Sequence, residues 1–213
     1  MKNLFLILSL SFVFTSCAQQ TSTKTEVKEE NKIPAAGSEA IATFAEGCFW
    51  HSELVFQSLV GVRDAVSGYV GGTDPNPDYE KVSTGSTGHA ETVEVYYDPS
   101  QISYETLVKA FFASQDPTTL NRQGNDAGTE YRSIAFYRTK EEKQIIEAEI
   151  KRLTDEKKYA NKIVTEVKPF TVFYPAEDYH QEYIENNPGN SYVKNVSIPD
   201  FLEFKKTFKG NFK

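Results

Sequence analysis

Residues 40–60 read AIATFAEGCFWHSELVFQSLV, and the rest of the chain is organised around this stretch. Residues 40–45 form a short apolar run that is typical of a strand, whereas from residue 52 to 60 apolar side chains recur three and four positions apart, as on a helix face. Cys48 therefore lies where a strand passes into a helix N-terminus. Unpaired N–H groups and the helix dipole favour a thiolate there, which makes Cys48 a candidate reactive thiol. A buried structural cysteine is the alternative.

The composition limits the classes of function. The chain has 213 residues, enough for one domain with a substantial core. Its formal net charge of -7 argues against nucleic acid as a partner, because phosphate binding needs a basic face. Cys17 and Cys48 are its only cysteines, so a disulfide framework and a CxxC pair are excluded. The histidines lack zinc-ligand spacing, and we expect no metal site.

The first 16 residues have the pattern of an export signal. Lys2 precedes an apolar run that ends at Phe14 and is too short to span a bilayer. Residues 14–17, FTSC, resemble a bacterial lipoprotein signal, although Phe14 stands where Leu is usual. The resemblance implies a lipid anchor on Cys17 and a protein held at a membrane, facing the periplasm or the cell exterior. An ordinary cleaved secretory signal is the alternative.

The remaining chain divides into three parts by composition. Residues 17–38 are rich in Gln, Thr, Ser, Lys and Glu, which predicts a flexible tether. A folded domain is expected at 39–187, and a basic C-terminal tail at 188–213. Within the domain, strands and helices are interleaved, but some links between strands are too short for crossover helices. This pattern predicts a two-layer α/β domain with a mixed sheet.

Several elements of the domain have local signals. Ser103 is expected to cap one helix, and Thr139 with Glu142 forms a capping box for another. The polar segment 116–129 between them has the length of a functional loop. Two further strands are predicted at 163–167 and 170–173.

Residues 89–97 are the most informative strand. Because side chains alternate along a strand, Glu91 shares a face with Val93, Val95 and Tyr97. Desolvation on this apolar face would raise the pKa of the Glu91 carboxyl, which suits a proton donor. A salt-bridged carboxylate at a strand end is the alternative.

A set of short motifs follows in one order between residues 44 and 183. They are GCFW at 47–50, TGHAE at 87–91, DPT at 116–118, NRQG at 121–124, Asp126, GT at 128–129, YRS at 131–133 and YHQ at 179–181. Together they resemble the peptide methionine sulfoxide reductases of the A type. The resemblance implies a ferredoxin-like α/β core, makes 39–187 the catalytic domain, and implies repair of oxidised exported proteins.

The resemblance also implies what individual residues do. Cys48 is the nucleophile and Glu91 is the acid. The other site residues that it implies are Phe49 and Trp50 as the apolar pocket for the substrate methyl group, Tyr79 and Tyr131 as hydrogen-bond donors to the sulfoxide oxygen, and Asp126 as a further polar member.

The chemistry agrees with this set of residues. A thiolate attacks the sulfoxide sulfur while the oxygen gains protons, which leaves a sulfenic acid on Cys48 and releases methionine. Selectivity for the S epimer follows from the resemblance, and the substrates are peptide-bound methionine sulfoxide and, as a second candidate, the free amino acid. We expect no bound cofactor.

Regeneration of the thiol requires a reductant. Many members of the family carry resolving cysteines near the C-terminus, but no cysteine follows Cys48 here. An external thiol is therefore expected, either a thioredoxin, a glutaredoxin-like protein or a small thiol. If Cys17 carried no lipid, the tether would be long enough to bring it back to Cys48.

The histidines leave other readings open. His51 replaces the Gly that commonly follows GCFW in the family, and it adds a titratable group near Cys48. His89 and His180 are expected to be structural. A cysteine hydrolase that pairs Cys48 with His89 or His180 is one alternative function, and a non-catalytic ligand-binding lipoprotein is the other.

Overall fold

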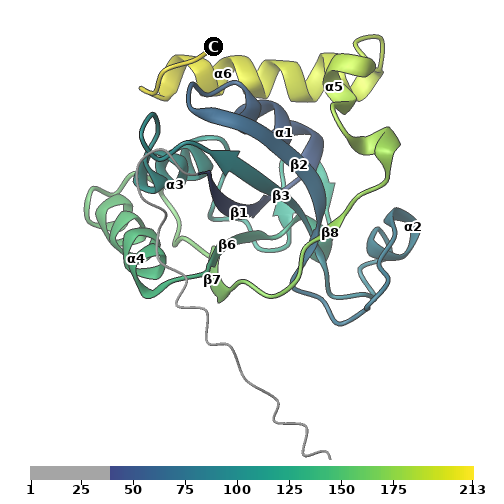
Figure 1. Cartoon of the computed structure of the whole chain (residues 1–213), viewed down its shortest axis with the longest axis horizontal. Helices are drawn as coiled ribbons and strands as arrows, with labels where there is room; N and C mark the ends of the chain where they lie inside the picture. Colours follow the sequence, from purple (N-terminus) through teal and green to yellow (C-terminus); the bar gives the residue numbers. More distant parts are fainter. Residues whose placement is uncertain (1–38) are drawn as a thin grey trace, which may run out of the picture. The chain divides into compact units, whose positions relative to one another are not determined.

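The computed structural model describes residues 39–213 (Figure 1). The predicted signal at 1–16, the tether at 17–38 and the lipidation site at Cys17 lie outside the described residues. Within 39–213, none of the helices combines the length and the apolarity that are required to cross a membrane.

A six-stranded mixed sheet in the order β7-β6-β1-β3-β2-β8 forms the centre of the fold. Neighbouring strands run antiparallel except β6 and β7, which are parallel. The predicted α/β class and mixed sheet are confirmed. The strands are β1 (Ala40–Glu46), β2 (Val62–Val70), β3 (Ala90–Tyr97), β6 (Ser133–Tyr137), β7 (Glu166–Pro169) and β8 (Tyr174–Pro175), and β4 (Arg122–Gln123) pairs with β5 (Asp126–Ala127) in a separate ribbon.

The two strands predicted late in the chain are displaced. β7 begins only at Glu166, and residues 170–173 are not a strand. Pro169 is the last residue of β7, and beyond it only the N–H of Phe170 still donates to β6, to Tyr137 O at 2.8 Å. Phe170 and Phe173 instead pack against a small apolar cluster on the second face of the sheet.

The helices begin largely where their caps predict. The Ser103 hydroxyl accepts a hydrogen bond from Thr106 N, and the Thr139 hydroxyl accepts one from Glu142 N. The helix predicted from residue 52 begins earlier, because Cys48 is its N-cap. The helices are α1 (Phe49–Gln57), α2 (Tyr79–Val82), α3 (Tyr104–Ala113), α4 (Lys140–Asp155), α5 (Tyr183–Asn186) and α6 (Ile198–Thr207), with the 3-10 turns η1 (Thr129–Tyr131) and η2 (Asp178–His180) and the π-helical turn η3 (Val193–Ser197).

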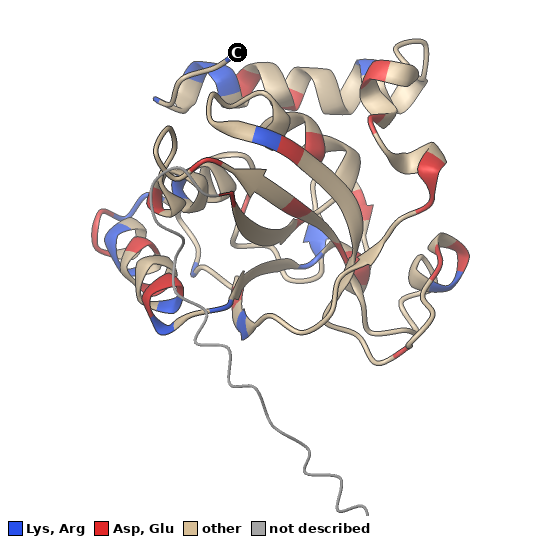
Figure 2. Cartoon of the chain, in the orientation of Figure 1, with Lys and Arg blue, Asp and Glu red and all other residues tan. Residues whose placement is uncertain are grey.

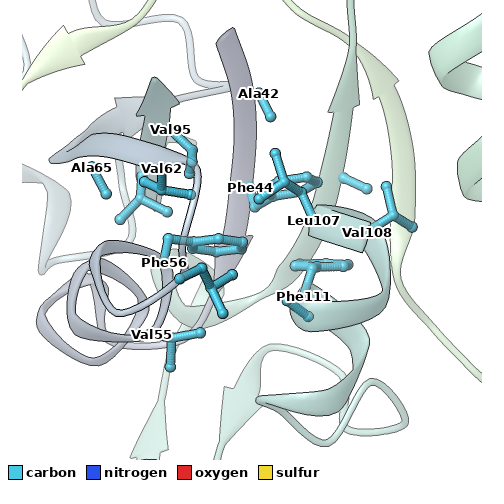
Figure 3. Packing of buried hydrophobic residues seen from close by; sticks show 14 of the residues in the cluster. Ala42, Phe44, Val55, Phe56, Val62, Ala65, Val95, Leu107, Val108 and Phe111 are labelled. Carbon is cyan, nitrogen blue, oxygen red and sulfur yellow. The ribbon is translucent and has the colours of Figure 1, made fainter. Parts of the chain in front are cut away.

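The main core lies between one face of the sheet and the helices α1, α3 and α4. Phe44 of β1 is at its centre (Figure 3). Its ring stacks on Phe56 of α1 at 5.2 Å and on Phe111 of α3 at 5.1 Å between centroids. This packing fixes α1, and therefore Cys48 at its start, against the sheet.

The segment 188–213 packs onto the same unit. Its helix α6 contacts α1 (Figure 1), and Val193 and Phe204 are buried. The backbone N–H of Val60 donates to Asn211 O at 3.0 Å. The residues that the sequence separates as a tail thus form part of the described fold.

Charged residues of both signs alternate along α4, an outer element of the fold (Figure 2). Lys151 pairs with Asp155 and Arg152 with Glu149 along this helix. Neutralisation of this kind leaves α4 without the uniformly basic face that nucleic acid would need.

Candidate active site

The turn between β1 and α1 presents Cys48. Gly47 adopts a φ of +105°, and a Cβ at this position would lie 2.6 Å from Gln123 Cβ. Only glycine fits both the backbone conformation and the close approach. The following residue, Cys48, is the N-cap of α1, and its carbonyl accepts hydrogen bonds from His51 N at 3.1 Å and Ser52 N at 3.3 Å.

A cavity of about 260 Å³ opens beside Cys48. All of the residues that the sequence assigns to the site line it, together with two that the sequence did not indicate, Asn190 and Tyr192. The lining residues are Cys48, Phe49, Trp50, Tyr79, Glu91, Asp126, Tyr131, Asn190 and Tyr192. We refer to this cavity as the substrate pocket.

Glu91 lies on the face of β3 that the alternation predicts. It is 2% exposed, and its Oε2 accepts a hydrogen bond from Phe49 N at 3.0 Å. Desolvation raises the pKa of the Glu91 carboxyl to about 8, although the Phe49 N–H opposes the shift. No ion pair within residues 39–213 includes Glu91, so the salt-bridge alternative has no partner there. A carboxyl that keeps its proton at neutral pH is suited to donate it.

The Cys48 thiol is less acidic than its position at a helix start suggests. Burial raises its pKa well above the ordinary value, and the nearby Glu91 charge raises it further. The N–H groups of Trp50 and His51 lower the pKa, as expected at a helix N-terminus, but burial outweighs them. In this structure, burial therefore acts against the thiolate that the helix start favours. Protonation of Glu91 removes one cause of the raised pKa, whereas burial and the Asp126 charge remain.

An aromatic wall encloses one side of the pocket. Trp50 stacks on Tyr183 with 3.6 Å between ring centroids and an interplanar angle of 6°. Its indole N–H donates to His180 Nδ1 at 3.0 Å, and Phe49 packs beside His180 at 5.0 Å. Rings held in this way form an apolar surface that suits a methyl group.

Two tyrosine hydroxyls from separate elements face the same pocket. Tyr79 begins α2 and Tyr131 ends η1. Burial raises the pKa of both phenols, so both remain hydrogen-bond donors at neutral pH. The carboxylate of Glu177 positions Tyr79 by accepting a hydrogen bond from its backbone N–H at 2.9 Å, and it also accepts one from Tyr69 OH.

Tyr192 and Asn190 enter the pocket from the C-terminal segment. The Tyr192 hydroxyl donates a hydrogen bond to Asp126 Oδ2, and its ring meets Trp50 edge-on. Asn190 Oδ1 accepts a hydrogen bond from Tyr192 N at 2.8 Å and so fixes the turn. No local pattern marks Tyr192, because its side-chain contacts with Asp126 and Trp50 are distant in sequence. The Asn/Pro/Gly stretch that begins at Asn186 is a turn signal just before it.

His89 and His180 do not form a catalytic pair with Cys48. His89 Nδ1 accepts from Gly72 N at 3.2 Å, and its Nε2 lies 2.9 Å from Asp74 O. His180 faces Trp50. Neither histidine lines the substrate pocket. Both occupy structural positions, so the hydrolase alternative lacks the pairing of Cys48 with His89 or His180 that it requires.

Comparisons with known proteins agree with this geometry. Residues 40–211 match the family model described as peptide methionine sulfoxide reductase. The peptide methionine sulfoxide reductase MsrA of Deinococcus radiodurans is 47% identical over 194 residues, 91% of each chain. The MsrA of Pasteurella multocida is 50% identical over 168 residues, which are 79% of this chain and 95% of the relative.

Solved structures resemble the fold as well. Reduced Mxr1 from Saccharomyces cerevisiae superposes with a TM-score of 0.65 at 34% identity, covering 71% of this chain and 87% of that one. Methionine sulfoxide reductase A of Corynebacterium diphtheriae gives a TM-score of 0.64 at 35% identity, covering 72% and 77%. The chain belongs to the peptide methionine sulfoxide reductase family, in its MsrA branch, whose activity is the reduction of peptide-bound methionine S-sulfoxide.

Proposed function

We propose that this chain reduces methionine S-sulfoxide through a sulfenic acid on Cys48, which an external thiol then reduces. The observation that carries the proposal is the convergence of Cys48, the protonated Glu91 and two tyrosine hydroxyls on one cavity beside an aromatic wall. A sulfoxide needs these three environments together: a nucleophile for the sulfur, proton donors for the oxygen and an apolar surface for the methyl group.

The first half-reaction follows from this arrangement. Cys48 Sγ attacks the sulfoxide sulfur while Glu91 donates a proton to the oxygen, and the hydroxyls of Tyr79 and Tyr131 hold that oxygen. The oxygen passes to Cys48 as a sulfenic acid, methionine leaves, and Cys48 is oxidised by two electrons.

The second half-reaction requires reducing equivalents from outside the domain. Cys48 is the free cysteine of residues 39–213, and no cysteine follows it in the sequence. One thiol displaces water from the sulfenic acid to form a mixed disulfide, and a second thiol releases Cys48. A thioredoxin, a glutaredoxin-like protein and a small thiol all supply this chemistry.

A single-turnover experiment tests the proposal. Reduced protein is mixed with a peptide that contains methionine sulfoxide, without reductant, and methionine is measured together with trapping of the sulfenic acid. We expect about one methionine per protein for the wild type and none for Cys48→Ser. Turnover by Cys48→Ser would refute the mechanism. Adding thioredoxin, glutaredoxin or dithiothreitol in separate arms identifies the reductant.

We also propose that the protein is exported and anchored to a membrane by a lipid on Cys17. There it would repair oxidised exported proteins. The support is the sequence alone: an apolar run after Lys2 and the motif FTSC at 14–17. Intact mass of protein extracted from membranes tests it. A diacylglycerol adduct on an N-terminal Cys17 is expected, whereas a soluble product cleaved elsewhere would contradict it.

A further inference from the structure

A second cavity lies on another side of Cys48. It has a volume of about 60 Å³ and is lined by Glu46 of β1, His51 of α1 and Ser197 of η3, among others. We call it the rear cavity. Cys48, Asp126 and Tyr192 line both the rear cavity and the substrate pocket, so these residues form the partition between them.

Polar atoms without a protein partner are concentrated around the rear cavity. Glu46 and Ser197 are 2% and 1% exposed, yet Glu46 Oε1 and Ser197 Oγ have no hydrogen-bond partner among the described residues. Both ring nitrogens of His51 are also shielded from solvent and unpaired there. Buried polar groups of this kind are normally satisfied by protein or by water. Since one water needs about 10–15 Å³, the rear cavity has room for several.

Glu46 and His51, the two titratable side chains with unpaired atoms in the rear cavity, would form different hydrogen bonds with such water. Glu46 Oε2 accepts a hydrogen bond from Ser114 Oγ at 2.9 Å, and desolvation raises the pKa of the carboxyl to about 8, so it is a neutral donor at pH 7. Burial lowers the pKa of His51, which leaves a neutral imidazole with a free acceptor nitrogen. A neutral acid and a neutral base therefore face one cavity next to the thiol.

The proposed mechanism leaves one proton without a group to receive it. Glu91 is protonated and donates to the sulfoxide oxygen, so it is not available as the base for the Cys48 thiol. We propose that water held in the rear cavity by Glu46 carries the Cys48 proton to His51 and back, along a route separate from the substrate pocket. The inference rests on the proposed nucleophilic function of Cys48.

The proton balance of the cycle is closed by this route. As Cys48 Sγ attacks, its proton passes through water to His51, and the Glu91 proton passes to the oxygen that becomes the sulfenic hydroxyl. The resulting imidazolium and the Glu91 carboxylate exchange one proton through solvent. When the external thiol later displaces Cys48 from the mixed disulfide, the departing thiolate recovers a proton through His51.

The other charges around the rear cavity act on His51 from several elements. Asp200 of α6 raises the pKa of His51 and so favours the imidazolium, and the backbone carbonyls of Ser114 and Ser197 do the same without reaching hydrogen-bond geometry. The remaining titratable groups that line the cavity are Glu46 of β1, Cys48, Asp126 of β5 and Tyr192 of the C-terminal segment.

Single-turnover methionine formation from pH 5.5 to 9 tests the proposal, with His51→Gln, which cannot accept a proton at these pH values. We expect the rate of this variant at pH 7 to be lower than that of the wild type by about 10-fold or more. This loss is at or below the lower end of the range for general-base catalysis. In His51→Gly, added imidazole should restore the rate in proportion to its unprotonated form. Glu46→Leu should be slower than Glu46→Gln, because glutamine still binds water.

The matched control is Gln115→Ala, which removes an unpaired buried oxygen outside both cavities and should retain the wild-type rate. Circular dichroism and thermal unfolding confirm that each variant is folded. Wild-type rates in His51→Gln across the pH range would overturn the inference, as would a folded His51→Gly that imidazole does not accelerate. A wild-type protein that forms no methionine would instead refute the proposed function, and this inference with it.

Discussion

The backbone N–H of Phe49 donates a hydrogen bond of 3.0 Å to Oε2 of Glu91, 42 residues away in sequence. This contact joins the first turn of α1 to the middle of the sheet and holds the acid beside the nucleophile. It also explains why Glu91 tolerates burial: one of its oxygens is paired, while the other remains free to hold and donate a proton.

Glu91→Gln should remove the acid and leave the hydrogen bond to Phe49 in place. We expect single-turnover reduction to slow by about 100-fold or more. In the wild type the acid-dependent rate should fall as the pH rises through about 8, because Glu91 then loses its proton. That decline should be missing from the variant. Glu94→Gln, on the opposite face of β3, is the matched control and should keep both the rate and the decline.

The pH dependence of Cys48 alkylation should reveal its environment. Because burial and the Glu91 charge both raise its pKa, the alkylation midpoint is expected above that of a cysteine peptide. Glu91→Gln should move the midpoint down, since it removes the charge without exposing the thiol. Measurement with iodoacetamide in a Cys17→Ser background isolates the Cys48 signal. A midpoint below that of the free peptide would contradict the electrostatics described above.

Tyr192→Phe should slow reduction by about 10-fold, because the variant loses the hydrogen bond to the Asp126 carboxylate but keeps the aromatic contact with Trp50. Steady-state assays that separate kcat from KM are the measurement. Tyr159→Phe is the control: it loses a hydrogen bond of 2.7 Å to Phe112 O, far from the pocket. Equal losses in the two variants would show that a general effect on stability, rather than the site, is responsible.

Phe44→Ala should lower the free energy of unfolding by about 3–5 kcal/mol, because it leaves a cavity between the rings of Phe56 and Phe111. Urea denaturation followed by fluorescence measures the change. Val60→Ala at the surface should stay within about 0.5 kcal/mol of the wild type. A small loss in Phe44→Ala would mean that α1 and α3 are anchored in another way.

Stability should fall as the pH rises from about 5 to 8, because Glu46 and Glu91 retain their protons in the folded state and lose them earlier in the unfolded chain. For a carboxyl whose pKa is higher in the folded state, the contribution to stability is complete below the pKa of the unfolded chain. It is lost as the pH rises toward the pKa of the folded state. The slope is about 1.4 kcal/mol per pH unit for each group. Glu46→Gln should therefore flatten the dependence by about that amount, as measured by urea denaturation at several pH values. An unchanged slope would show that Glu46 is ionised in the folded protein.

Local signals in the sequence were reliable wherever the physical cause is itself local. The alternation of β3 places Glu91 on the core face, and the caps at Ser103 and Thr139 begin α3 and α4 as expected. The strand at 170–173 was wrong because an apolar run does not reveal which partner it packs against. There, tertiary packing of Phe170 and Phe173 replaced strand pairing.

The sequence by itself determined the strand-to-helix turn that carries Cys48 and, through co-ordered motifs, the residues that surround it. Only the tertiary structure decided their chemistry. Burial raises the pKa of the Cys48 thiol against the local effect of the helix start, because desolvation depends on every element that covers a group. The tertiary structure also brings Tyr192 into the substrate pocket from the C-terminal segment. Glu46 and His51 share the rear cavity only because η3 and α6 close over them. These residues are neighbours only in the folded structure, and no local pattern of the sequence encodes that proximity.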